Sequence, residues 1–156
     1  MIRLADFQPE HADGAVAVVR AVHDEYGFTW EAGGYHADLY DVPGHYLAPG
    51  GMFQVMVEGP RVIGTVGVIP HDARECELHR MYLHPDCRGR RLGQRLLDAA
   101  LNWARSTGRT RMVLWSDVKL THAHALYRAN GFRPNGDRIC NDPDNSHEYG
   151  FVREPL

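Results

Sequence analysis

Two kinds of hydrophobic periodicity meet in the middle of the chain. Within residues 74 to 83 the run ELHRMYL alternates with a period of two, which is typical of a β-strand, and Pro85 ends it. After the turn at residues 88 to 93 the spacing changes to three and four, which predicts one face of a helix that ends at Gly108. The apolar helical positions are Leu92, Leu96, Leu97, Ala100, Leu101 and Ala104.

The same patterns predict regular elements on both sides of this unit. A helix follows Pro9, and Gly59-Pro60 joins two strands into a hairpin. Gly131 closes a later helix, and Asn135-Gly136 and residues 143 to 145 carry turn chemistry. The predicted strands are 2–5, 52–58, 61–70, 110–115 and 147–152, and the predicted helices end near residue 27 and span 121–130.

Aromatic and acidic residues are mixed in the segment from residue 25 to residue 46, which is expected to be loop and short helix. Tyr26, Phe28 and Trp30 could line a pocket for an amine, through cation–π and carboxylate contacts. They could equally form a second small core with an acidic rim. The spacing does not separate these two interpretations.

Length and composition are those of an ordinary globular protein. The 156 residues predict a single domain, 1–156, and the net charge of -3 disfavours a nucleic-acid partner. No apolar run approaches a membrane span, and acids replace the apolar core of a signal peptide near the N-terminus, so no membrane contact and a cytoplasmic location are expected. The three cysteines suit reduced thiols, and the ten histidines lack metal-ligand spacing, so no metal is expected.

The turn RGRRLG joins a predicted strand to a predicted helix. The first amides of a helix lack partners within it and point outward with the dipole, which favours phosphate. Gly89 and Gly93 would allow close approach to the backbone, and Arg88, Arg90 and Arg91 supply positive charge. The alternative is a solvated loop in which the glycines only turn the chain.

Two motifs resemble the signature of the GCN5-related N-acetyltransferase (GNAT) family. Residues 88 to 93 resemble its acyl-CoA motif Q/R-x-x-G-x-G/A, with Arg91 where the family prefers glycine. The run AHALYRANGF resembles A-x-x-L-Y-x-x-x-G-F. The positions that match the second motif are Ala123, Leu126, Tyr127, Gly131 and Phe132.

This resemblance implies an α/β fold with a mixed, mostly antiparallel central sheet flanked by helices. It implies an N-acetyltransferase that uses acetyl-CoA as cosubstrate, and it is compatible with a homodimer. The backbone of the strand would pair with the pantetheine arm, and the turn would hold the pyrophosphate. The residues implied for acetyl-CoA are Met81, Tyr82, Leu83, Arg88, Gly89, Arg90, Arg91, Leu92, Gly93 and Gln94.

The resemblance also implies a general base at Glu77 and a general acid at Tyr127. Strict alternation would place Glu77, His79 and Met81 on one strand face, and partial burial would raise the pKa of Glu77 toward neutrality. A surface glutamate paired with arginine is the alternative, and Glu75 and His79 are reserve candidates for the base. A phenol can share its proton with a departing thiolate.

The expected acceptor is the primary amine of a small molecule, near Tyr26, Phe28, Trp30 and His79. Acetylation of a protein lysine or N-terminus is a second hypothesis. A non-catalytic CoA sensor is a third, since Arg91 departs from the motif, and a phosphate-binding module unrelated to CoA is a fourth.

Overall fold

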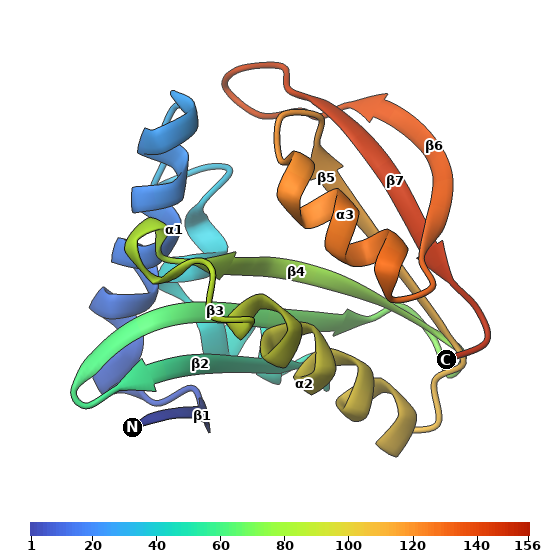
Figure 1. Ribbon diagram of the computed structural model, residues 1–156, viewed down its shortest axis with the longest axis horizontal. Helices are drawn as coiled ribbons and strands as arrows, with labels where there is room; N and C mark the ends of the chain where they lie inside the picture. Colours follow the sequence, from blue (N-terminus) through green and yellow to red (C-terminus); the bar gives the residue numbers. More distant parts are fainter.

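The computed structural model describes residues 1–156 and contains one seven-stranded sheet in the order β1-β2-β3-β4-β5-β7-β6. Every neighbouring pair is antiparallel except β4 and β5, which are parallel, so the predicted mixed α/β fold is confirmed (Figure 1). The strands are β1 (Ile2–Asp6), β2 (Met52–Glu58), β3 (Arg61–Pro70), β4 (Glu75–Leu83), β5 (Arg111–Asp117), β6 (Arg133–Ile139) and β7 (His147–Arg153). The helices are α1 (Ala12–Tyr26), α2 (Leu92–Ser106) and α3 (Thr121–Ala129), with short helical turns at Ala37–Tyr40 and Pro43–Leu47.

Helices α1 and α2 cover opposite faces of the sheet. The six apolar positions predicted for the central helix are all buried in a core with β2, β3 and β4. A second core lies on the other face, where α1 packs with Leu39 and Tyr46 from the aromatic segment. Both cores form because each helix presents one apolar stripe to the sheet.

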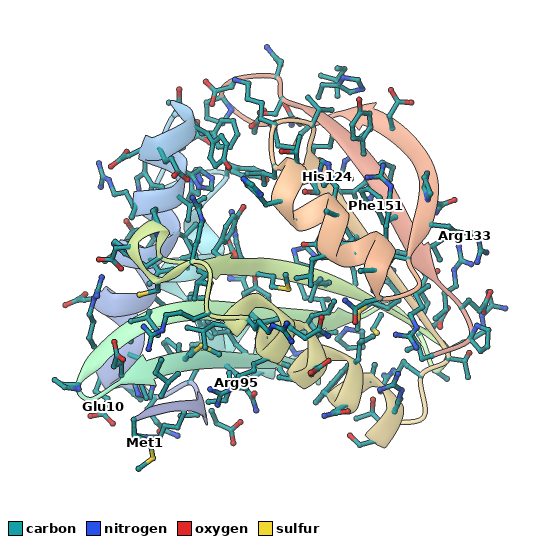
Figure 2. All side chains as sticks on the ribbon, in the orientation of Figure 1. Met1, Glu10, Arg95, His124, Arg133 and Phe151 are labelled. Carbon is teal, nitrogen blue, oxygen red and sulfur yellow. The ribbon has the colours of Figure 1, made fainter.

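The parallel strands β4 and β5 pair over three residues and then separate. Only Glu75, Cys76 and Glu77 have partners on β5, and the rest of β4 has a free edge on that side. Figure 1 shows the two strands diverging from a common end. Helix α3 packs against β7, the strand next to β5. His124 of α3 lies beside Phe151 of β7, with ring centroids 5.2 Å apart (Figure 2).

A bulge in β4 corrects the predicted strand alternation. His79 pairs with Gly67 and Tyr82 pairs with Thr65, so β4 carries one extra residue between these pairs. Arg80 takes a left-handed φ of 48° there, and the Thr65 hydroxyl donates to its carbonyl oxygen at 2.7 Å. The extra residue moves Met81 to the face opposite Glu77 and His79, and Tyr82 takes its place.

Strand β6 is the main element that the sequence did not predict. Its residues are exposed throughout, so no alternation of apolar and polar positions marks it. Gly136, expected in a turn, instead has φ 82° within a bulge of the β6–β7 pairing. The strand exists because β7 offers it a pairing edge, which is a tertiary contact.

The remaining predicted elements are confirmed within a few residues. Gly27 ends α1 in a left-handed conformation with φ 74°, as expected of a C-terminal glycine. No helix is both long enough and apolar enough to cross a membrane.

Candidate active site

One cavity has a volume of about 1100 Å³ and is lined by residues from both of the diverging strands β4 and β5. Its walls include Glu77 and His79 of β4, Tyr127 of α3 and the first turn of α2. The structure therefore brings together the predicted base, the predicted acid and most of the predicted phosphate turn, which lie up to 50 residues apart in sequence (77 to 127). Of the predicted turn, only Arg90 does not line the cavity.

The turn before α2 presents unpaired backbone donors. The N–H groups of residues 88 to 91 donate no backbone hydrogen bond, and those of Leu92, Gly93 and Gln94 have no acceptor within the helix. Gly89 has φ 83°, a conformation that glycine adopts without strain. A Cβ on Gly93 would lie 3.5 Å from Leu126, so the helix start fits closely against α3.

Two of the three arginines in the turn are held by carboxylates. Arg88 forms two hydrogen bonds of 2.7 Å with Glu25 of α1, and Arg90 pairs with Glu58 at 3.2 Å. Arg91 forms none of the ion pairs and lines the cavity. The charge available to an anion near the free amides is therefore that of Arg91.

The free edge of β4 forms another wall of the cavity. Met81, Tyr82 and Leu83 all line it, although the bulge turns Met81 to the opposite face from Tyr82. The β4 backbone has no β5 partner here, so an extended chain could add to it as a strand.

Glu77 lies between two histidines. Its carboxylate oxygens are 2.9 Å from His79 Nε2 and 3.0 Å from His71 Nε2. Burial acts to raise the pKa of Glu77, but the hydrogen bond and charge of His79 and the charge of His71 outweigh it, and the pKa lies below its ordinary value. The expected rise toward neutrality is therefore wrong, because the two histidines beside the carboxylate favour its charged form. The alternative pairing with arginine is also wrong.

Tyr127 is buried, and its hydroxyl has no hydrogen-bond partner within the protein. Its ring packs between Phe132 and Phe151, each with centroids at 5.7 Å. Burial raises the pKa of Tyr127 further above its ordinary value, so the phenol keeps its proton.

The aromatic segment is anchored to the β4 bulge by a buried ion pair. Arg80 donates to both carboxylate oxygens of Asp38 at 3.0 and 2.9 Å and to the carbonyl oxygen of Tyr35 at 2.8 Å. The Tyr46 hydroxyl donates to Asp38 as well. This contact holds residues 35 to 46 against the strand that carries Glu77.

The aromatic segment combines the two interpretations left open by its sequence. Tyr26 and Phe28 stack at 5.8 Å and line the cavity, whereas Tyr46 belongs both to the second core and to the cavity wall. Trp30 does not line the cavity, because its ring stacks on His36 at 3.9 Å. A role for Tyr26, Phe28 and Trp30 in binding the acceptor stays a prediction.

Two segments far apart in sequence meet beside the cavity. Asp144, between β6 and β7, accepts from the backbone and the hydroxyl of Thr29, at 2.7 and 2.6 Å. Glu148 of β7 is buried, lines the cavity and pairs with Arg138 at 2.8 Å. These contacts hold Thr29 and Glu148 in the cavity wall through polar partners.

Several contacts that shape this site were not predicted from the sequence: the ion pair of Asp38 with Arg80, His71 beside Glu77, and Arg138 as the partner of Glu148. A charged arginine inside an otherwise patterned strand is a weak signal for a buried partner. Nothing in the sequence identifies Asp38 as that partner, 42 residues earlier in the chain.

The fold is shared with solved acetyltransferases. A crystal structure of an acetyltransferase from Streptococcus agalactiae 2603 superimposes with a TM-score of 0.86, covers 98% of both chains, and is 21% identical in sequence. This likeness defines the class of protein by its fold.

Sequence comparison defines the family. Residues 16–132 match the model of the acetyltransferase (GNAT) family, and the uncharacterized N-acetyltransferase YjgM of Escherichia coli K12 is 37% identical over 123 residues, 74% of this chain and 72% of that protein. Rat N-acetyltransferase 8 is 30% identical over 108 residues, 65% of this chain, and the chain spans only 49% of that protein. The chain belongs to the GNAT family, and its enzyme class is acyltransferase.

Proposed function

We propose that this protein transfers an acetyl group from acetyl-CoA to the primary amine of a small molecule. The observation that carries the proposal is the single cavity of about 1100 Å³, which joins the amides at the start of α2 to the Glu77–His79 pair and to Tyr127. A thioester held along this cavity would lie between groups that can accept and donate a proton.

The residues present fit acetyl-CoA, whose chemistry is the supply of an activated acetyl thioester. Unpaired amides of residues 89 to 94 and the Arg91 side chain match a diphosphate in charge and in hydrogen-bonding capacity. The free edge of β4 matches an extended amide-containing arm. The fold neighbour aminoglycoside 6'-N-acetyltransferase, 15% identical with a TM-score of 0.75, was crystallised with coenzyme A.

Three side chains would handle the protons of the reaction. The Glu77–His79 pair faces the cavity and can take the proton of the amine. Tyr127 lines the same cavity, and its hydroxyl would share its proton with the departing thiolate sulfur as the C–S bond breaks.

The acceptor side of the cavity favours a compact amine. Asp142 lines it together with the aromatic rings of Tyr26 and Phe28, and these groups favour a cation. The contact between Thr29 and Asp144 joins two loops beside the cavity, which restricts access by a folded protein.

The proposal is tested by thiol release from acetyl-CoA across a panel of small primary amines, with lysine peptides and N-terminal peptides as a second panel. We expect release with one or more small amines and none with peptides. Release with peptides alone would replace the small molecule by a protein acceptor. CoA binding by calorimetry with no release from either panel would favour a non-catalytic sensor, and tighter binding of ATP than of CoA would remove the assignment to CoA.

A further inference from the structure

Glu77 shares its two carboxylate oxygens between two imidazoles that differ in their surroundings. His79 lines the cavity and contacts Oε2 at 2.9 Å, whereas His71 does not line the cavity and contacts Oε1 at 3.0 Å. The side chain of Glu77 is 16% exposed and that of His79 is 34% exposed. The imidazole is thus the more accessible of the two candidate proton acceptors.

The contact with Glu77 selects one tautomer of His79. A ring nitrogen 2.9 Å from an ionised carboxylate oxygen carries a proton, because a lone pair there would be repelled. Neutral His79 therefore has its proton on Nε2 and its lone pair on Nδ1. The contact with Glu77 uses Nε2, so Nδ1 is the ring nitrogen left for a bound amine.

His71 fixes the carboxylate from the far side. Its Nδ1 is 2.8 Å from Glu75 Oε1, and Glu75 is held in turn by Arg111, whose Nε donates at 2.8 Å. Both ring nitrogens of His71 therefore face carboxylates. Burial acts to lower the pKa of His71, but these two glutamates outweigh it and raise the pKa.

We propose that His79 Nδ1 is the atom that accepts the proton from the acceptor amine, and that Glu77 and His71 are positioning residues that act through His79. In this step the N–H bond of the amine breaks, the Nδ1–H bond forms, and the nitrogen keeps the electron pair with which it attacks the acetyl carbon. The resulting imidazolium is stabilised by the Glu77 carboxylate and releases its proton to water. The inference rests on the proposed function and refines the role of Glu77 within it.

Other charged groups near the pair belong to different elements. Asp38 lies in the helical turn Ala37–Tyr40. Its negative charge interacts with His79, but the ion pair with Arg80 neutralises that charge. Arg138 of β6 acts on Glu77, and it is paired with Glu148. His45 also lines the cavity. None of these groups contacts a nitrogen of His79, so Glu77 is the charge that sets its tautomer.

The test compares pH profiles of kcat/KM for wild type, His79→Gln and Glu77→Gln, using an amine that wild type acetylates. We expect His79→Gln to lower kcat about 100-fold or more and to abolish the acid limb of the profile. Glu77→Gln should keep the limb and lower kcat less than His79→Gln does, because the proton-accepting nitrogen is still present. The reverse pattern, with the limb lost in Glu77→Gln and retained in His79→Gln, would overturn the inference and make Glu77 the base.

His71→Gln separates positioning from a purely structural role. We expect kcat to fall several-fold with KM unchanged and with the acid limb shifted rather than lost. His147→Gln is the matched control, since His147 pairs with Asp137 at 2.7 Å outside the cavity, and it should leave kcat and the profile unchanged. An unchanged kcat and profile in His71→Gln would remove His71 from the arrangement.

Nitrogen NMR of the histidine rings in the free protein supplies a readout independent of turnover. We expect His79 to show the Nε2–H tautomer in wild type and a mixture of tautomers in Glu77→Gln. A predominant Nδ1–H tautomer in wild type would overturn the inference. Wild-type activity retained by His79→Gln would overturn this inference alone, whereas wild type without thiol release from any amine would overturn the proposed function and the catalytic role together.

Discussion

Arg91 occupies the position at which the structure requires a left-handed backbone, and this makes it the most informative residue to change. Its φ is 57° and its ψ is 23° at the residue before α2. A side chain in this conformation destabilises the folded state by roughly 1 to 2 kcal/mol. Glycine avoids this strain, but its more flexible unfolded chain lowers the stability by about 0.4 to 1 kcal/mol. Arg91→Gly should therefore be more stable than Arg91→Ala by about 0.5 to 1 kcal/mol.

The comparison of Gly with Ala isolates the backbone, since both variants lose the same charge. At this chain length the difference corresponds to roughly 2 °C in Tm, measured by calorimetry. Calorimetry with CoA should show both variants binding about 5-fold more weakly than wild type, the effect of about 1 kcal/mol from one partly exposed charge.

Arg90 provides the matched control one residue earlier. Its φ is not positive, and its side chain pairs with Glu58 outside the cavity. Arg90→Gly should therefore be less stable than Arg90→Ala, because there is no backbone strain for glycine to relieve. This is the opposite of the order expected at Arg91. The same order of Gly and Ala at both positions would refute the strain argument, and unchanged CoA affinity in both Arg91 variants would refute its role as the available cation.

Three further predictions concern the walls of the cavity. Asp38→Asn should lower the free energy of unfolding by about 3 kcal/mol, because Arg80 is left buried without its charged partner. Burial acts to raise the pKa of Asp38, but Arg80 lowers it overall, so the difference from wild type should be full at pH 7 and should shrink as the pH falls below about 4 in urea titrations. Tyr127→Phe should lower kcat about 10- to 100-fold with Tm unchanged, since its hydroxyl has no protein partner, and a wild-type kcat would contradict its role as acid. Asp144→Ala removes both hydrogen bonds to Thr29 and should raise KM for the amine with little change in KM for acetyl-CoA. Equal rises in both KM values would show that this contact does not support binding of the amine in particular.

Local patterns predicted the scaffold of the site but not its charge balance. The strand with Glu77, the turn at residues 88 to 93 and the helix with Tyr127 each carry a short-range signal, so they could be placed from sequence. The direction of the Glu77 pKa shift could not, because it depends on how closely the folded chain brings His79 and His71 to the carboxylate. The face of Met81 could not either, because alternation carries no information about a bulge.

The amino-acid sequence alone determined the periodic elements, the two family motifs and the glycine-bearing turn, since each depends on residues within a few positions of one another. Only the tertiary structure decided that β4 and β5 separate after Glu77, that Arg80 buries its charge against Asp38, and that two imidazoles share one carboxylate. These features depend on pairings between distant segments, whose energies are set by burial and geometry in the folded chain rather than by local propensity.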